Sequence, residues 1–272
     1  MTDKYAVIGN PVGHSKSPLI HAEFARQTGE DMSYVAIFAP HGEFEAAVER
    51  FRSEGGRGMN VTLPFKHRAY ALAQVRSVRA GQARAVNTLA FESDGVHGDN
   101  TDGAGLVRDL TVNLARVLSG TRILLMGAGG ASYGVCGPLL DECPAELTVA
   151  NRTRAKALAL CEHFRSVDPL AHVLSGCGYD ELAGRRFDLV INATSASLVG
   201  DMPHLPPGVF APGALAYDMV YGAATPFLEL ASANKAQRAD GLGMLVEQAA
   251  ESFRIWRGVR PETAPVIAML RR

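Results

Sequence analysis

Apolar and polar positions follow two patterns along the chain, one typical of strands and one typical of helices. Runs of β-branched and aromatic residues predict strands at 4–8, 32–38, 58–62 and 86–92. Apolar residues at helical spacing predict helices at 18–28, 43–54 and 65–75. Because strands and helices take turns in the manner of βα units, this part of the chain is predicted to form one α/β layer structure.

A second βα series follows a predicted helix at 103–118. Its strands are predicted at 121–126, 146–150, 187–191 and 214–219, with helices at 131–141 and 153–165. These strands are nearly all apolar, as parallel strands covered by helices on both faces should be. Two more helices are predicted at 243–257 and 262–271, and periodicity alone assigns them no role.

Composition narrows the class of protein. A chain of 272 residues with 47% hydrophobic content is long enough for two domains with separate cores. Its net charge of -1 argues against a nucleic-acid partner and against disorder. The first residues lack a basic segment followed by an apolar run, and no run approaches the length of a membrane span. We therefore expect a cytoplasmic protein with no membrane partner.

A glycine-rich turn follows the first strand of the second series. The turn reads Gly127, Ala128, Gly129, Gly130, Ala131 and Ser132, and it leads into a predicted helix. In a Rossmann unit the first glycine permits the tight turn, and the second lets the backbone approach a pyrophosphate at the helix N-terminus. Ser132 stands where a third glycine is usual. Glycines alone are weak evidence, but the strand and helix around them indicate a dinucleotide site.

Cations at the end of the next strand indicate which dinucleotide. Arg152, Arg154 and Lys156 occupy the region where an NAD enzyme would place a carboxylate for the ribose hydroxyls. Guanidinium groups match the oxygens of a 2′-phosphate, so NADP is favoured. The alternative is a solvated helix start capped by Thr153. It is the weaker interpretation, because cations at a helix N-terminus oppose the helix dipole.

Lys66 is placed unfavourably by local energetics. The predicted strand 58–62 leads to Pro64, which suits the first position of a helix, so Lys66 falls in the first turn with His67 and Arg68. A cation there costs roughly 0.3 to 1 kcal/mol. Since the local structure gains nothing from this lysine, a functional role is indicated.

Polar residues gather at strand ends in the first series. The loop after the first strand carries Ser15 and Ser17 on either side of Lys16, and hydroxyls of this kind can bind a small polyol or carboxylate. Other polar residues at or beyond predicted strand ends are Asn60, Thr62, Lys66, Asn87, Thr88 and residues 99–102. Ligands of open α/β sheets bind beyond the carboxyl ends of strands, so these residues predict a binding site.

Eight motifs occur in a fixed order over nearly the whole chain. They cover residues 9–11 with 14–18, 60–66, 85–88, 98–103, 151–153, 192–195, 217–219, and 240–245 with Gln248. The set resembles the shikimate and quinate dehydrogenase family. The resemblance implies a two-domain α/β fold: an α/β substrate domain of residues 1–103 and 241–272, and a Rossmann-type NADP domain with a doubly wound parallel sheet of residues 104–240.

The resemblance also implies an activity and its residues. The activity is the NADPH-dependent, reversible reduction of 3-dehydroshikimate to shikimate in chorismate and aromatic amino acid biosynthesis. Separately, the histidines show no metal-ligand spacing, so no metal is expected, and the expected assembly is a monomer or homodimer. The implied catalytic pair is Lys66 and Asp102. The implied substrate residues are Ser15, Ser17, Thr62, Asn87, Tyr221 and Gln248. The implied cofactor residues are Gly127, Ala128, Gly129, Gly130, Ala131, Asn151, Arg152, Thr153, Lys156, Thr194, Met219 and Gly241.

The sequence is compatible with two roles for Lys66 and with more than one substrate. Lys66 either passes a proton to and from the substrate oxygen or remains a fixed positive charge beside it. Burial would favour the neutral amine, whereas Asp102 would favour the ammonium. The substrate alternatives are quinate alone or both quinate and shikimate. A more distant alternative is a non-catalytic NADP sensor, which the presence of both Lys66 and Asp102 disfavours.

Two residues depart from the family pattern. Arg84 stands where family members often have glycine, so we expect a turn there that avoids positive φ. Tyr133 replaces a small or basic residue, and is expected either to pack on its helix or to alter the approach to the adenosine phosphate.

Overall fold

A computed structural model describes residues 2–194, 196, 205–222 and 224–272. The chain divides into two compact units. Unit 1 comprises Met1–Gly105 and Leu245–Arg272, and unit 2 comprises Leu106–Met244. No helix in the part of the chain that the structure describes is both long and apolar enough to cross a membrane.

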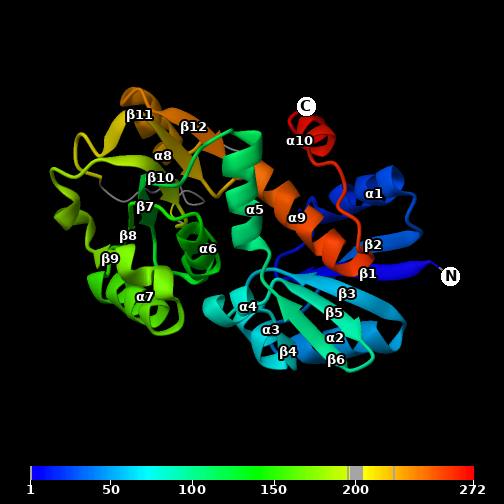
Figure 1. Ribbon diagram of the computed structural model, residues 1–272. Helices are drawn as coiled ribbons and strands as arrows, with labels where there is room; N and C mark the ends of the chain where they lie inside the picture. The colour runs from blue at the N-terminus through cyan, green and yellow to red at the C-terminus, as the bar shows by residue number, and fades with distance from the viewer. Residues whose placement is uncertain (1, 195, 197–204, 223) are drawn as a thin grey trace. The chain divides into compact units, whose positions relative to one another are not determined.

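Unit 1 is built on a six-stranded sheet (Figure 1). Its strands are β1 (Asp3–Gly9), β2 (Met32–Phe38), β3 (Gly56–Val61), β4 (Val75–Arg76), β5 (Thr88–Glu92) and β6 (Gly95–Asp99). Its helices are α1 (Ser17–Thr28), α2 (Phe44–Ser53), α3 (Lys66–Leu72), α4 (Val78–Ala83) and α10 (Ala264–Leu270). Helices α5 (Asp102–Arg108) and α9 (Leu242–Arg257) each continue from one unit into the other.

The sheet of unit 1 is mixed, which the sequence pattern did not predict. Strand order is β2-β1-β3-β5-β6-β4; β1 runs parallel to β2 and β3, whereas β5 runs antiparallel to β3 and β6. The β5–β6 hairpin turns at Gly95, whose φ of 141° favours glycine. As a result, the amino end of β5 lies at the same edge of the sheet as the carboxyl ends of β1, β3 and β6.

Helices cover both faces of this sheet, each over its own hydrophobic cluster. Side chains of α2, α3 and α4 pack with the sheet in one cluster that includes Phe44, Met59 and Phe65. Those of α1, α9 and α10 pack in another that includes Phe24 and Phe253. Figure 1 shows α1 and α9 on one side of the sheet and α2 and α3 on the other.

Unit 2 is a doubly wound parallel sheet, as the sequence predicts. Its strands are β7 (Arg122–Met126), β8 (Glu146–Ala150), β9 (Leu174–Cys177), β10 (Phe187–Asn192), β11 (Phe210–Asp218) and β12 (Gln237–Asp240). Its helical segments are η1 (Asp109–Asn113), α6 (Gly130–Asp141), α7 (Arg154–Val167), η2 (Pro169–Val173), η3 (Tyr179–Leu182) and α8 (Pro226–Ala233). The order β12-β11-β10-β7-β8-β9, parallel throughout, is that of a Rossmann fold.

Three local expectations are wrong. Helix α3 begins at Lys66 with Phe65 as its N-cap, so Pro64 precedes the helix instead of opening it. The helix expected at 103–118 ends earlier, because a π turn at 109–113 leads to Ala115 at φ 49°. Arg84 does adopt positive φ, at 49°, where it forms the left-handed C-cap of α4 and donates its backbone N–H to Gly81.

Candidate active site

Strand direction explains why polar residues gather at one edge of the unit 1 sheet. Parallel β1 and β3 end together, so the loop of Ser15 and the residue Thr62 emerge side by side. A Cβ on Gly9 would lie 2.4 Å from Cγ2 of Thr62, and this close approach requires glycine. Antiparallel β5 starts at this edge, which brings Asn87 to the same place.

The loop before α1 is shaped by Ser15. Its Oγ accepts the N–H of Ser17, the first residue of the helix, at 3.2 Å, and Lys16 occupies the N-cap position. Ser17 is buried and Ser15 is half-buried. Ser15 therefore shapes the loop, and Ser17 begins the helix that follows it.

Lys66 and Asp102 form an ion pair at this edge. Lys66 Nζ lies 2.6 Å from Asp102 Oδ2, and the side chains are 26% and 12% exposed. Lys66 is at the unfavourable start of α3, as the sequence predicts, whereas Asp102 is in the first turn of α5, where the helix dipole favours a carboxylate. The pair thus places the amine of Lys66 directly against the carboxylate of Asp102.

Asn87 fixes the second oxygen of Asp102. The backbone N–H of Thr101 can only donate, and it lies 2.8 Å from Asn87 Oδ1. The amide nitrogen must then point the other way, and it donates to Asp102 Oδ1 at 2.8 Å. Since Lys66 binds Oδ2 and Asn87 binds Oδ1, both oxygens of the carboxylate are held.

Gln248 of α9 completes this cluster. Its Oε1 lies 3.3 Å from Nδ2 of Asn87 and 3.3 Å from Oγ1 of Thr101, and its own Nε2 donates to Leu245 O. Helix α5 passes close behind it, because a Cβ on Gly105 would lie 2.7 Å from Cβ of Gln248. The segment after residue 245 therefore returns to unit 1 and supplies a residue to its polar edge.

A buried polar layer lies under Asn87, and two of its members, Tyr34 and Ser252, were not predicted. Ser252, fully buried, lies 2.8 Å from Oγ1 of Thr88 and accepts from Nδ2 of Asn60 at 2.9 Å. Tyr34 donates its phenol to Asn60 Oδ1 at 2.7 Å. The only sequence signal for Ser252 is its place one helical turn after Gln248, on the same face of α9.

In unit 2 the glycine-rich turn joins β7 to α6. Gly127 has φ 103°, and a Cβ there would lie 3.1 Å from Cγ2 of Thr194 at the end of β10. Between β7 and β10 the strand order reverses, which is where doubly wound folds bind ligands. No side chain caps the start of α6 at Gly129, and a Cβ on that glycine would meet nothing within 4 Å. The start of α6 is exposed at Gly129 and Gly130, which leaves room for a phosphate at its backbone donors.

The serine in place of a third glycine is accommodated. Ser132 is fully buried, and its Oγ donates to the carbonyl of Gly127 at 2.9 Å. Tyr133 packs on Phe164 of α7, with ring centroids 6.1 Å apart, and on His163 at 5.5 Å. Tyr133, which lies on α6, therefore packs against the neighbouring helix α7 and not on its own helix.

Other cofactor candidates line the same edge of the unit 2 sheet. Asn192, fully buried at the end of β10, accepts from the backbone N–H and the hydroxyl of Thr194. Met219 donates its N–H to Asn192 O at 3.0 Å. A Cβ on Gly241 would lie 2.2 Å from Met219 O, so that contact requires glycine. Ser195, part of the same motif, lies outside the described residues.

The three cations after β8 are not equivalent. Arg154 donates to Glu181 Oε1 at 2.7 Å. A hydrogen bond from the Gly178 backbone, followed by the contact with Arg154, holds the pKa of Glu181 below its usual value. The side chains of Arg152 and Lys156 are exposed and form no hydrogen bond or ion pair with the described residues. Asn151 donates to Thr153 O at 2.9 Å and shapes this loop.

The remaining expected residue, Tyr221, belongs to unit 2, whereas the other substrate candidates belong to unit 1. It is half-buried after β11, and burial raises the pKa of its phenol. Within the described ranges, no group of three or more His, Cys, Asp or Glu side chains is placed to hold a metal ion.

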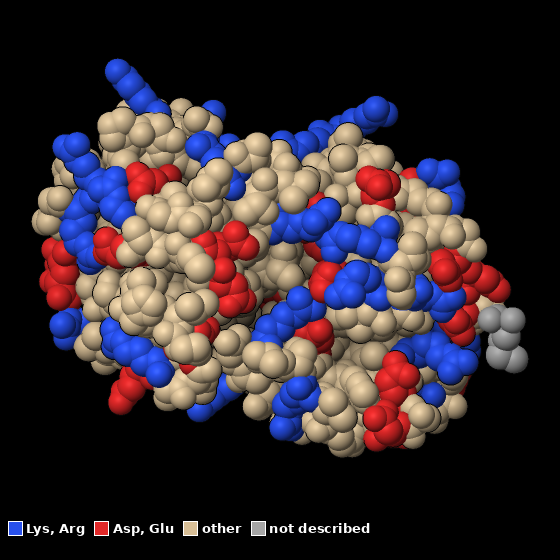
Figure 2. Space-filling model, viewed as in Figure 1, with Lys and Arg blue, Asp and Glu red and all other residues tan. Residues whose placement is uncertain are grey.

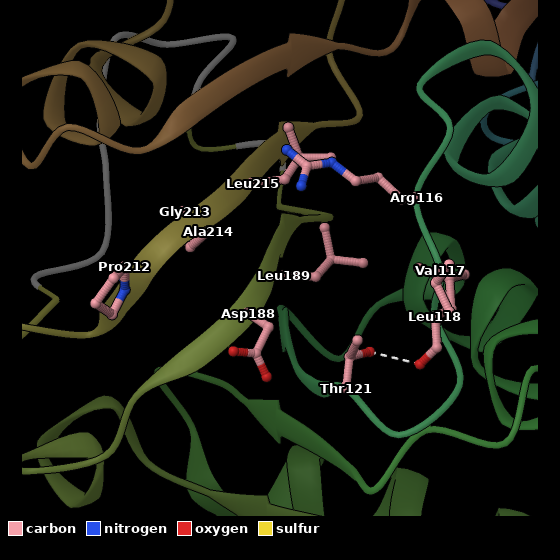
Figure 3. Close-up of a pocket in the computed structure, with 10 residues that line it drawn as sticks. All are labelled: Arg116, Val117, Leu118, Thr121, Asp188, Leu189, Pro212, Gly213, Ala214 and Leu215. Atoms are coloured by element: carbon pink, nitrogen blue, oxygen red, sulfur yellow. Dashed lines mark hydrogen bonds between the residues drawn. The ribbon is translucent and has the colours of Figure 1, made fainter.

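Neither the charge on the visible face nor the unit 2 pocket points to a further site among the described residues. Figure 2 shows acidic and basic side chains interspersed over the visible face. A pocket of about 100 Å³ in unit 2 (Figure 3) lies at the amino ends of β7 and β10, opposite the glycine-rich turn. Its polar groups are satisfied, since Thr121 donates to Leu118 O and Asp188 pairs with Arg122.

Three family models match the chain. The model described as "Shikimate dehydrogenase substrate binding domain" matches residues 7–89. The model "Shikimate / quinate 5-dehydrogenase" matches residues 109–199. The model "Shikimate 5'-dehydrogenase C-terminal domain" matches residues 241–271.

Relatives and solved structures agree over the full length. A protein of Aromatoleum aromaticum named "Shikimate dehydrogenase (NADP(+))" is 62% identical, over 99% of this chain and 97% of that protein. The crystal structure of an Ael1 enzyme from Pseudomonas putida has a TM-score of 0.93 at 51% identity, covering 99% and 98% of the two chains. The shikimate 5-dehydrogenase of Thermus thermophilus, solved with NADP(H) and shikimate, has a TM-score of 0.87 at 33% identity, covering 100% and 99%.

Proposed function

Because this chain belongs to the shikimate dehydrogenase family, we propose that it is an NADP-dependent oxidoreductase that interconverts 3-dehydroshikimate and shikimate. The observation that carries this proposal is the 62% identity, over 99% of the chain, to a shikimate dehydrogenase (NADP(+)). The reaction serves the biosynthesis of chorismate and the aromatic amino acids. Residues 1–103 and 241–272 form the substrate domain, and residues 104–240 form the NADP domain.

Lys66 handles the proton. Reduction of a ketone needs a hydride at carbon and a proton at oxygen, and bound NADPH supplies the hydride. The Lys66 ammonium donates its proton to the carbonyl oxygen, and in the oxidation direction the neutral amine takes the hydroxyl proton back. Support comes from the 2.6 Å contact of Lys66 with Asp102, which aligns the amine at the polar edge.

Asp102 orients both the lysine and the substrate. Its Oδ1 and Oδ2 are held by Asn87 and Lys66, so the carboxylate can accept a substrate hydroxyl in one defined geometry. The other substrate contacts are Ser15, Ser17, Thr62, Asn87, Tyr221 and Gln248. Hydroxyls and amides suit a polyhydroxy acid because each can donate and accept.

The residues of unit 2 fit NADP. The pyrophosphate would bind at the turn from Gly127 to Ala131, where the α6 backbone donors have no side-chain cap. Arg152 and Lys156, with Asn151 and Thr153, would hold the 2′-phosphate, and Thr194, Met219 and Gly241 would hold the remainder of the dinucleotide. The exposed cations favour NADP over NAD.

Steady-state kinetics with two acids and two cofactors test this function. We expect NADP-dependent oxidation of shikimate with a kcat/KM far above that for quinate or for NAD. Comparable values for quinate would instead establish a dual dehydrogenase, in keeping with the shikimate/quinate family model. Tight NADP binding without turnover of either acid would point to a sensor. The protein acts in the cytoplasm, where NADPH is available, as a monomer or homodimer, which light scattering would distinguish.

A further inference from the structure

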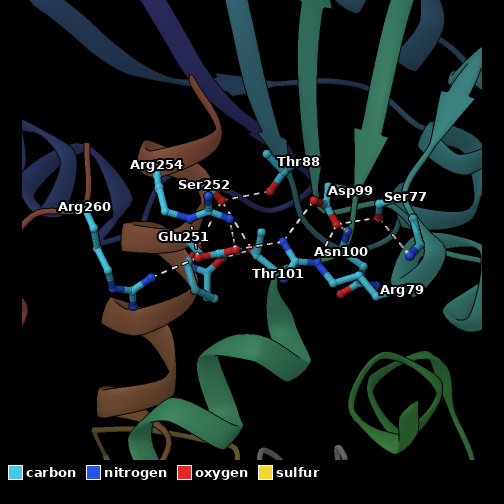
Figure 4. A network of polar contacts seen from close by, with 12 residues as sticks. Ser77, Arg79, Thr88, Asp99, Asn100, Thr101, Glu251, Ser252, Arg254 and Arg260 are labelled. Atoms are coloured by element: carbon cyan, nitrogen blue, oxygen red, sulfur yellow. Dashed lines mark hydrogen bonds and ion pairs between the residues drawn. The ribbon is translucent and has the colours of Figure 1, made fainter. Parts of the chain in front are cut away.

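One arginine outside the proposed active site joins two of the elements that build it. Arg79 lies in α4 and is 25% exposed. Its Nε and Nη2 bind the two oxygens of Asp99 at 2.6 and 2.9 Å, and Nη2 also binds Glu251 Oε1 at 3.0 Å. Figure 4 shows this guanidinium between the end of β6 and helix α9.

Asp99 shapes the turn that presents Asp102. Its Oδ1 accepts the backbone N–H of Asn100 at 2.6 Å, and its carbonyl accepts the N–H of Asn87 at 3.0 Å. Asn100 continues the turn, because its Oδ1 accepts the N–H of Asp102 at 3.1 Å and its Nδ2 donates to Ala85 O. The side chain of Asp99 is therefore three residues and two hydrogen bonds away from the catalytic carboxylate.

Glu251 links Arg79 to α9, the helix that carries Gln248. It lies three residues after Gln248, which puts the two side chains on neighbouring turns of one helix. Arg254 and Arg260 also donate to Glu251, at 2.8 and 2.9 Å. Burial alone would raise the pKa of Glu251, but the hydrogen bonds and charges of Arg254 and Arg79 lower it to about 2. Glu251 is therefore a carboxylate at working pH and a permanent partner for Arg79.

On the basis of the proposed function, we infer that Arg79 is a positioning residue for shikimate binding, which sets the distance between the turn that carries Asp102 and the helix that carries Gln248. It does so through Asp99 and Glu251 and touches no substrate itself. The planar guanidinium is needed because one group must bind two oxygens of Asp99 and one of Glu251 at once. A lysine ammonium is a point donor and cannot reproduce that fork.

The experiment compares Arg79→Ala with Arg76→Ala in the full-length enzyme. Arg76 is a control on the neighbouring strand: its guanidinium donates to the Tyr70 carbonyl and stacks over the Tyr70 ring and binds neither Asp99 nor Glu251, although its backbone on β4 pairs with Gly98. For Arg79→Ala we expect about a tenfold rise in KM for shikimate, a smaller fall in kcat, and an unchanged KM for NADP. Arg76→Ala should keep all three parameters.

Two further measurements separate positioning from a loss of folded protein. Guanidinium ion at tens of millimolar should partly restore the KM of Arg79→Ala, and Arg79→Lys should not. In a double-mutant cycle, Gln248→Ala should add little to the KM of Arg79→Ala, because both act on the same contact. If Arg79→Ala does not fold, Glu251→Gln keeps an acceptor oxygen but removes the negative charge, so it should weaken the link to Arg79 and raise KM to a smaller extent.

Some outcomes would overturn the inference. An unchanged KM in Arg79→Ala, or a fall in kcat that matches the loss of folded protein, leaves Arg79 with a structural role only. Full additivity with Gln248→Ala would do the same. If the unmodified chain oxidises no shikimate, the proposed function itself fails, whereas normal wild-type kinetics with an unaffected variant refute only the role of Arg79.

Discussion

Lys66 Nζ lies 2.6 Å from Asp102 Oδ2, although 36 positions separate the two residues. Each stands at the start of a helix, α3 or α5, but the helix dipole disfavours the lysine and favours the carboxylate. The carboxylate of Asp102, which lies outside α3, therefore offsets the unfavourable interaction between the charge of Lys66 and the dipole of that helix.

Replacing Lys66 tests both possible roles of the lysine. Lys66→Ala should lower kcat by about 10² to 10⁴, the usual contribution of a positioned acid or base, with NADP affinity unchanged. Lys66→Arg keeps the positive charge but does not give up its proton at working pH. If Lys66 transfers the proton, we expect Lys66→Arg to be as inactive as Lys66→Ala in steady-state assays.

The same two variants can also show that Lys66 does not transfer the proton. Substantial activity in Lys66→Arg would show that a fixed charge suffices and that the proton travels by another route. Near-normal turnover in Lys66→Ala would refute the catalytic assignment altogether. Lys4→Ala is the matched control, since Lys4 is exposed and donates only to the Glu54 carbonyl.

Asn87→Ala should impair substrate binding and stability together. It removes the donor to Asp102 Oδ1 and leaves the buried N–H of Thr101 without its acceptor. We expect a higher KM for shikimate and a free energy of unfolding lower by about 1 to 3 kcal/mol. Urea unfolding and kinetics check both, with Asn234→Ala, an exposed asparagine, as control. Unchanged stability would mean that the Thr101 N–H finds another partner.

Cofactor choice should depend on Arg152 more than on Arg154. Arg154 is paired with Glu181, whereas Arg152 forms no such bond with the described residues. We expect Arg152→Ala to weaken NADP binding about tenfold or more, or about 1.4 kcal/mol, with little effect on NAD. Arg154→Ala should have a smaller effect on NADP. Calorimetry with both cofactors decides this, and equal losses for NADP and NAD would count against a 2′-phosphate site.

His21 should make unit 1 sensitive to acid. It is fully buried, stacks on Tyr34 with ring centroids 4.2 Å apart, and neither ring nitrogen has a hydrogen-bond partner among the described residues. Burial lowers its pKa to about 3. Between pH 6.5 and 3 the unfolded chain binds a proton that the folded chain does not, so stability from this group is complete above pH 6.5 and is lost as pH falls towards 3.

The variant His21→Phe tests this linkage because it keeps an aromatic ring in the stack. Urea unfolding at about pH 7 and about pH 5 should show a smaller loss of stability on acidification than in the unmodified protein. An equal pH dependence in both proteins would exclude His21 as the titrating group. His163→Phe is a control, because His163 lies on α7 in unit 2 and packs beside Tyr133.

The Rossmann fold of unit 2 is predictable because its central strands are apolar on both faces. Strands β7 and β8 are buried almost throughout, so hydrophobic runs mark them. The edge strand β12 reads Gln-Arg-Ala-Asp and is mostly exposed, so hydrophobic pattern cannot identify it. Strand β6 reads Gly-Val-His-Gly-Asp and has a single large apolar residue, so hydrophobic pattern misses it, although Asp94-Gly95 at its start is a hairpin signal.

The polar edge of unit 1 is only partly predictable. The strand ends that carry Thr62 and Asn87 can be predicted from the sequence pattern. The pairing of Lys66 with Asp102 was predicted only from the family resemblance. The contacts of Arg79 with Glu251 and of Asn60 with Ser252 join residues 172 and 192 positions apart. No local pattern encodes them, because they depend on the return of α9 to the first unit.

Because α9 returns to unit 1, the two units are completed in a fixed order during synthesis. A ribosome completes unit 2 before it makes residues 245–272, so the dinucleotide fold has its whole sequence while unit 1 still lacks most of α9 and all of α10. Until α9 emerges, Asn60 lacks Ser252 and the Leu89 carbonyl lacks the Trp256 indole, which lies 3.0 Å away in the finished protein. The nascent chain should therefore gain the capacity to bind a nucleotide first, and a site for a polyhydroxy acid only with its last helices.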